Sequence, residues 1–177
     1  MANCGLKTEP AYKTTQISNG ERENNAMKIM ESLLDQKYNL GLKDYMAAGI
    51  VGNMWAESKW NQTAYIATDT GQGQSGGLCQ WHDKVNGKGR FTNLLNFAKS
   101  NNKSWQDLQL QISFLIDELK NKQNHALTAL KKTENVDDAT TMFCRKFEVS
   151  SVCYPDGTPT DRIKKSKEVL EKWRQQH

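Results

Sequence analysis

A glycine-rich stretch near the middle of the chain separates two regions of helical pattern. Residues 61–89, NQTAYIATDTGQGQSGGLCQWHDKVNGKG, hold six of the twelve glycines and show no helical period. Each glycine lowers helix stability by about 1 kcal/mol relative to alanine, and glycine clusters favour turns. The stretch therefore predicts a turn-rich insert with a short hairpin, within a domain that is mainly α (α+β).

Apolar residues recur at helical spacing on both sides of this insert. Proline, with three residues, is scarce enough to allow long helices. Ser104 and Asp107 form an S-x-x-D near-match to a capping box, and Phe143 and Phe147 lie four residues apart on an expected core face. The expected helices cover residues 21–38, 42–58, 90–101, 104–121, 125–132, 136–149 and 160–176.

The helix expected over residues 42–58 carries small residues on one side. Ala48, Gly49, Gly52 and Ala56 cluster there. Two glycines inside a helix cost roughly 1 kcal/mol each, so backbone from another element is expected to pack closely against this side. The segment is therefore predicted to be the central helix of the fold.

Length and charge limit the class of protein. At 177 residues the chain fits one domain, with a polar lead-in over residues 1–20 and a single domain over residues 21–177. Lys and Arg number 24 and Asp and Glu number 20, and the net charge of +4 suits an anionic partner such as a bacterial wall without requiring one. The sequence contains no basic run interleaved with aromatic residues, so it gives no support to nucleic-acid binding. We also expect no membrane span and no signal peptide, because the chain lacks both apolar patterns.

The four cysteines are too few and too irregularly spaced for a disulfide scaffold. Cys79 and His82 form C-x-x-H and could join Cys144 and Cys153 in a zinc site, but the usual paired ligand pattern is missing. Buried small hydrophobic residues or free thiols are the favoured interpretation. We therefore expect neither a metal site nor a cofactor.

Glu57 occupies an unusual place, in the last turn of the predicted central helix, although acidic side chains favour the first turn. Trp55 and Trp60 supply apolar walls that disfavour an ionised carboxylate. An acid that keeps its proton can protonate the leaving oxygen of a glycosidic bond. The alternative is a surface glutamate paired with Lys59 or another base.

The segment SGGLCQW, residues 75–81, has the composition of a sugar-binding loop. Gln80 offers an amide and Trp81 a flat indole, and sugars bind to amides and aromatic faces. Asp69 is the nearest second acid after Glu57, and it suits two roles equally: a base for the attacking water, or a cap of a turn.

Other polar residues suit structural roles better. His82, followed by Asp83, is expected to be a hydrogen-bonding surface residue outside the catalytic set. Glu148 can pair with Arg145 three residues earlier, so a structural salt bridge is its expected role. Glu148 is kept as the reserve second acid.

The segments AAGIVGNMWAESKWN, DTGQGQSGGLCQWH and GRFTNLLNFA resemble the bacteriophage tail lysozymes, over roughly residues 45–150. The resemblance implies a lysozyme-like helical domain with a small β-hairpin beside a cleft. It also implies that Glu57 is the catalytic acid. The residues it implies for the glycan-binding groove are Ser75, Gly77, Leu78 and Gln80, to which the indole of Trp81 is added from its chemistry.

The expected function is cleavage of the β-1,4 bond between N-acetylmuramic acid and N-acetylglucosamine in peptidoglycan glycan strands. The resemblance implies a place in the phage virion tail, among other virion or tail proteins. Two products are open: a hydrolysed sugar if a base such as Asp69 activates water, or an anhydro sugar if the muramic hydroxymethyl oxygen attacks. The main alternative is a non-catalytic structural or glycan-binding tail subunit, followed by a zinc amidase or endopeptidase.

Overall fold

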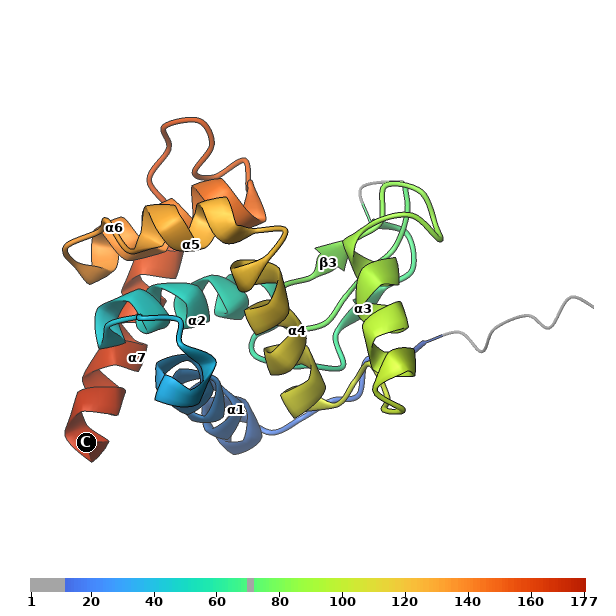
Figure 1. Ribbon diagram of the computed structural model, residues 1–177, viewed down its shortest axis with the longest axis horizontal. Coiled ribbons are helices and arrows are strands. Elements are labelled where there is room, and N and C mark those ends of the chain that lie inside the picture. The colour runs from blue at the N-terminus through green and yellow to red at the C-terminus, as the bar shows by residue number, and fades with distance from the viewer. Residues whose placement is uncertain (1–11, 70–71) are drawn as a thin grey trace, which may run out of the picture.

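A computed structural model describes residues 12–69 and 72–177, and it is mainly helical with a small sheet. The helical body and a small lobe that carries β3 and α3 lie on either side of α4 (Figure 1). This confirms the predicted fold class. The elements are α1 (Asn19–Leu34), η1 (Gln36–Tyr38), α2 (Asp44–Ser58), β1 (Tyr65–Ile66), β2 (Ser75–Gly76), β3 (Trp81–His82), α3 (Arg90–Ser100), α4 (Leu108–Lys120), α5 (Asn124–Leu130), α6 (Val136–Phe143), η3 (Cys144–Glu148) and α7 (Thr160–Gln176).

Helix α2 is the central helix, as its small residues predict. It packs against α1, α6 and α7 (Figure 1). A Cβ atom added to Gly49 would lie 2.9 Å from the backbone nitrogen of Thr140, in α6. One added to Gly52 would lie 2.9 Å from the carbonyl oxygen of Arg162 and would overlap the Ser166 hydroxyl, both in α7. The two glycines therefore let α6 and α7 approach the α2 backbone.

Local hydrogen bonds explain where the helices begin. Ser18 and Glu21 form a capping box at the start of α1, because the Ser18 hydroxyl accepts from the Glu21 amide at 3.1 Å and the Glu21 carboxylate accepts from the Ser18 amide at 2.8 Å. In α4 the cap is Asp107, whose carboxylate accepts from the Leu110 amide at 2.8 Å. The expected start at residue 104 is therefore wrong, and Ser104 lies in the preceding turn.

The lobe contains a three-stranded antiparallel sheet in the order β1-β2-β3, in place of the expected single hairpin. The described part of the polar lead-in is hydrogen-bonded to this lobe. Thr14 Oγ1 accepts from the Tyr65 amide at 2.9 Å, and Thr63 Oγ1 accepts from the Thr15 amide at 2.8 Å. Since the strands are only two residues long, these contacts and the packing below them hold the lobe in shape.

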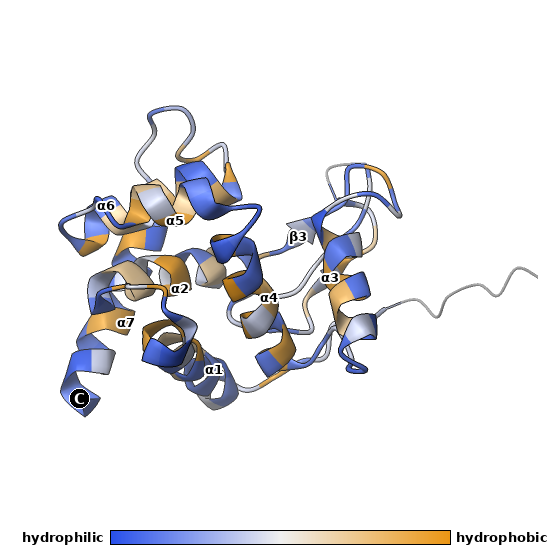
Figure 2. Cartoon of the chain, in the orientation of Figure 1, coloured by the Kyte–Doolittle hydropathy of each residue, from blue (hydrophilic) through white to orange (hydrophobic). Residues whose placement is uncertain are grey.

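One hydrophobic core runs through the helical body and under the lobe. Hydrophobic and hydrophilic bands alternate along α3 and α4, as expected for helices with one buried face (Figure 2). Phe143 and Phe147 are buried and stacked, with ring centroids 4.5 Å apart, which confirms their predicted place in the core. The helix expected over residues 136–149 changes at Cys144 from α6 to the π-helical turn η3.

The cysteines correct one prediction. Cys144 and Cys153 form a disulfide, where buried hydrophobic residues or free thiols were expected. Cys79 is a free and buried thiol, and burial raises its pKa well above the ordinary value. Cys4 lies outside the described residues. Among the helices that the structure describes, none is long and apolar enough to cross a bilayer.

We expect Gly52→Ala to lower the free energy of unfolding by about 1–3 kcal/mol, because the new methyl group would overlap the Ser166 hydroxyl at the contact with α7. A matched control is Gly20→Ala in α1, where the added Cβ would lie 3.8 Å from the Ser18 hydroxyl oxygen. The control should be neutral or stabilise the protein by up to about 1 kcal/mol. Urea unfolding measures both, and equal stabilities would contradict close packing of α2 on α7.

Candidate active site at the end of the central helix

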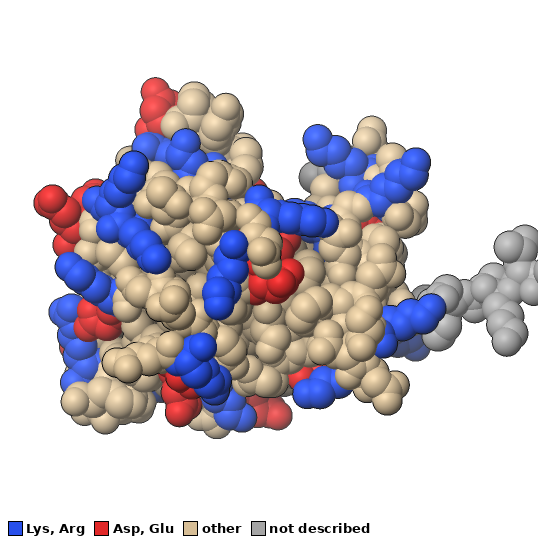
Figure 3. All heavy atoms as spheres, in the orientation of Figure 1, with Lys and Arg blue, Asp and Glu red and all other residues tan. Residues whose placement is uncertain are grey.

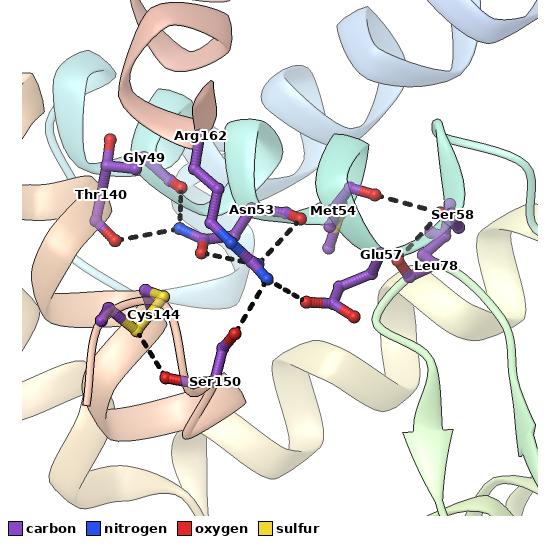
Figure 4. A network of polar contacts seen from close by, with 11 residues as sticks. Gly49, Asn53, Met54, Glu57, Ser58, Leu78, Thr140, Cys144, Ser150 and Arg162 are labelled. Carbon is purple, nitrogen blue, oxygen red and sulfur yellow. Dashed lines mark hydrogen bonds and ion pairs between the residues drawn. A yellow bond between two sulfur atoms is a disulfide. The ribbon is translucent and has the colours of Figure 1, made fainter. Parts of the chain in front are cut away.

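Glu57 lies in the last turn of α2, which ends because Lys59 adopts a left-handed conformation with φ 55°. Its side chain is 21% exposed, and Oε1 lies 2.6 Å from Nη2 of Arg162, in α7. One carboxylate oxygen points towards Arg162 and the other away from it (Figure 4). The partner is thus not Lys59 but a base from the far end of the chain, and Glu57 is only partly open to solvent.

Arg162 is fixed by contacts from three directions, as Figure 4 shows. Its Nη1 donates to Asn53 Oδ1 at 3.1 Å, and its Nη2 donates to the Ser150 hydroxyl at 3.3 Å. Asn53 in turn donates from Nδ2 to the carbonyl oxygens of Gly49 and Thr140, at 2.8 and 3.0 Å. The guanidinium is therefore held in place before any ligand binds.

The two tryptophans expected to form walls around Glu57 contact other partners. Trp60 is buried, and its Nε1 donates to the carbonyl oxygen of Val51 at 2.7 Å. Trp55 lies beneath Lys59, whose Nζ is 3.2 Å from the ring centroid. The partner that the structure shows for the Glu57 carboxylate is therefore a cation, Arg162.

The glycine-rich segment is attached directly to the end of α2. The Ser58 hydroxyl donates to the carbonyl oxygen of Leu78 at 2.9 Å, and the Leu78 amide donates to Gln111 Oε1 at 2.9 Å. Leu78 is fully buried, and Gly77 has φ 83° with no room for a Cβ between Gln111 and Trp81. Gly77 and Leu78 therefore place the lobe beside Glu57 and do not present side chains to a ligand.

Trp81 does not have the expected role of a platform for sugar stacking. Its side chain is buried, and Nε1 donates to Glu118 Oε2 at 2.7 Å. Gln80 lies in the turn before β3 with φ 45°, and its Nε2 donates to the carbonyl oxygens of Ala64 and Gly77, at 3.2 and 3.0 Å. Gln80 Oε1 is buried and accepts no hydrogen bond from the described residues, so it is the free polar group of this turn.

Asp69, Ser75 and His82 form a cluster within the lobe. Ser75 is buried, and its hydroxyl lies 2.6 Å from Asp69 Oδ2 and 2.9 Å from His82 Nδ1. The side chains of Asp69 and His82 are each 31% exposed. The neighbouring Asp83 is buried and accepts from the amide and hydroxyl of Thr92, at the start of α3. Asp69 and His82 therefore face solvent from a fixed position, whereas Asp83 is structural.

Glu148 lies in η3 and does not pair with Arg145, which corrects the expected salt bridge. Arg145 donates instead to the carbonyl oxygens of Cys153 and Gly157. Glu148 Oε1 is buried without a hydrogen-bond partner among the described residues. Burial raises the pKa of Glu148 well above its ordinary value, and the nearby charge of Glu57 raises it further. Glu148 therefore keeps its proton in conditions where an exposed glutamate loses it.

A second buried ion pair lies close to these acids. Arg90 donates to both carboxylate oxygens of Glu118, at 2.9 and 2.8 Å, and its guanidinium lies 4.2 Å from the centre of the Phe147 ring. Neither Arg90 nor Glu118 stands out in the sequence, because each belongs to an ordinary amphipathic helix. Only the packing of α3 against α4 brings them together.

The described residues contain no cluster of three or more His, Cys, Asp and Glu side chains that could hold a metal ion. The disulfide takes two thiols, Cys144 and Cys153, away from the zinc site considered above. Lys and Arg are spread over the face in Figure 3 and do not gather in one patch. The same view shows a notch between the helical body and the lobe.

A helical body, a small sheet lobe and a glutamate at the end of the central helix define a lysozyme-like protein. The family model described as "Phage tail lysozyme" matches residues 24–173 of this chain. The chain therefore belongs to the phage tail lysozyme family, which supports an association with the phage tail. A search of curated proteins found no match.

Glu148 should make stability depend on pH. Its pKa is raised above 4.5 in the folded protein, so above pH 4.5 the unfolded chain releases this proton while the folded protein still binds it. Each rise in pH within that window then favours unfolding, until the pH passes the folded pKa. We expect the free energy of unfolding of Glu148→Gln not to show this decrease with rising pH. Urea unfolding at several pH values measures it.

The exposed residue Glu134 offers a matched control, since Glu134→Gln removes the same charge from the surface. Parallel pH curves for wild type and Glu148→Gln would contradict a neutral Glu148.

Proposed function

We propose that this protein is a peptidoglycan glycosidase that cuts the β-1,4 bond between N-acetylmuramic acid and N-acetylglucosamine, with Glu57 as the general acid. The observation that carries this proposal is the position of Glu57: in the last turn of α2, partly exposed, and joined to the lobe through Ser58 and Leu78. A glycan strand that lies between the body and the lobe would pass this carboxyl group. Family membership supports the substrate class.

A general acid needs a proton, and Glu57 is paired with Arg162 in the free protein. Glu148 explains how the site retains one. Two interacting carboxyl groups do not both ionise readily, so the pair holds a proton to a higher pH than an isolated glutamate would. In this proposal Glu57 gives its proton to the glycosidic oxygen, while Arg162 keeps its hydrogen bonds to Asn53 and Ser150.

The second carboxylate in this proposal is Asp69. A base that activates water must be ionised and open to water. Glu148 meets neither condition, because its Oε1 is buried and its pKa is raised. Asp69 is partly exposed and accepts a hydrogen bond from Ser75, which orients its carboxylate. We therefore assign hydrolysis with Asp69 as the base, and direct attack by the muramic hydroxymethyl oxygen becomes the competing outcome.

Four residues contribute to the proposed groove mainly by shaping the lobe: Ser75, Gly77, Leu78 and Gln80. Of these residues, Gln80 has a buried side-chain oxygen, Oε1, that accepts no hydrogen bond from the described residues. The expected setting is the phage virion tail, where the protein would act on the host wall beside other tail proteins. The competing function is a structural subunit that binds glycan, because the Glu57–Arg162 ion pair between α2 and α7 also suits a purely structural role.

Glu57→Gln should abolish lysis of purified cell walls, with a loss of at least about 10²- to 10⁴-fold, because glutamine has no proton to give. The fold should be retained, since the amide oxygen can still accept from Arg162. We expect a stability loss on the order of 1 kcal/mol, because a neutral acceptor binds the guanidinium less strongly. A zymogram and a thermal melt measure the two effects. Lysis at the wild-type rate would support the structural subunit instead.

Asp69→Asn should slow turnover by about 10²- to 10⁴-fold with little change in melting temperature, because asparagine keeps the shape and can still accept from Ser75. Turnover at saturating substrate separates this effect from weaker binding. Full activity in the variant would remove Asp69 from the mechanism. Mass spectrometry would then show anhydro products if the muramic oxygen is the nucleophile.

A further inference from the structure

A cavity of about 480 Å³ lies beside the Glu57–Arg162 ion pair. Its lining includes Arg162 itself and Ala56, the residue before Glu57, but not Glu57. The walls come from the end of α2, from residues just before and after Cys153 of the disulfide, and from the first turn of α7. A ligand in this cavity would therefore be next to the candidate active site without covering the catalytic carboxyl group.

The cavity lining combines apolar and charged side chains. Trp55, Val152 and Pro159 supply apolar surface, while Lys59 and Asp161 supply one charge of each sign. Val152 is 53% exposed, so its side chain is available for contact. The lining therefore suits a small ligand that carries both apolar groups and charges.

Lys59 makes no ion pair with the described residues. Its Nζ lies over the Trp55 ring, and Lys165 Nζ lies 4.9 Å from the centre of the same ring. Burial lowers the pKa of Lys59, and the charge of Lys165 lowers it further. The nearby Asp161 carboxylate raises it in part, while Arg162 and Arg22 lower it. Lys165 already pairs with Glu168, and Arg162 with Glu57. Lys59 is therefore the cation of this group that would gain most from an ion pair with an incoming anion.

We propose that this cavity is a subsite for the short peptide that branches from the glycan strand, with a peptide carboxylate on Lys59 and a peptide amino group near Asp161. This inference rests on the proposed function, because it assigns the cavity to another part of the same wall polymer. Wall peptides carry several carboxylates, small apolar side chains and, in many walls, an amino group. A phosphate group fits less well, because Asp161 would repel it and the apolar walls would have no partner.

Binding is tested without catalysis by adding a muramyl tripeptide, N-acetylmuramyl-L-alanyl-γ-D-glutamyl-L-lysine, to the Glu57→Gln protein. The indole N–H signal of Trp55, identified by its loss in Trp55→Phe, should shift on titration. Lys59→Gln should weaken the affinity by about fivefold, the upper range for an exposed charge pair. The exposed Lys132→Gln, which removes the same charge outside the cavity, should bind like the parent protein.

Turnover gives the second test, on glycan strands that bear their peptides and on the same strands after an amidase has removed them. We expect a lower KM for the peptide-bearing strands in the wild type, and Lys59→Gln should lose that preference while Lys132→Gln keeps it. Thermal melts of both variants exclude misfolding.

The outcomes separate this inference from the proposed function. Equal KM values for the two strands in the wild type, with a Trp55 signal that the muramyl tripeptide does not move, would overturn the subsite and leave the glycosidase intact. No cleavage of either strand would overturn the glycosidase, while a shifted Trp55 signal that depends on Lys59 would still support a peptide site. An equal shift with inorganic phosphate would overturn the assignment to the peptide.

Discussion

The guanidinium of Arg162 connects the packing of the helical body with the candidate active site. Arg162 approaches α2 only because Gly52 has no side chain to separate α7 from α2. Once there, it donates to Asn53, which is itself bonded to α6, and to Ser150, in the loop closed by the disulfide. A buried guanidinium with fewer partners would be costly, so these contacts and the ion pair with Glu57 depend on each other. The position of the catalytic candidate is thus a consequence of how three helices pack.

The sequence predicts the helical framework well, because helical period and glycine position are local properties. The span of α7 was predicted to the residue, and the role of α2 followed from Gly49 and Gly52. Glu57 could also be chosen from the sequence, since an acid at the end of an apolar helix is unusual. The sequence does not identify Arg162 as the ion-pair partner of Glu57, because Arg162 is one of many basic residues and only tertiary packing brings it to Glu57.

The errors in the lobe have a related cause. Trp81 has the right chemistry for stacking on a sugar, but its indole N–H is satisfied by Glu118 inside the protein. Sequence shows which groups a residue carries and not which side of a two-residue strand it faces. The disulfide was missed for a similar reason: spacing alone does not show that η3 and the next loop bring Cys144 and Cys153 together. Long-range contacts decide each of these cases.

Charge balance explains why one acid near the site must stay neutral. Three carboxyl groups, those of Glu57, Glu118 and Glu148, share the field of two guanidinium groups, the buried Arg162 and the half-buried Arg90. Arg90 is taken by Glu118 through two hydrogen bonds, and Arg162 by Glu57. Glu148 is left without a cation of its own, and removing its charge from water would cost several kcal/mol. The least costly state keeps a proton on Glu148, near Glu57, the proposed general acid. An apolar residue in place of Glu148 would avoid the cost of burying a carboxyl group, so the buried acid fits the proposed catalytic role better than a purely structural one.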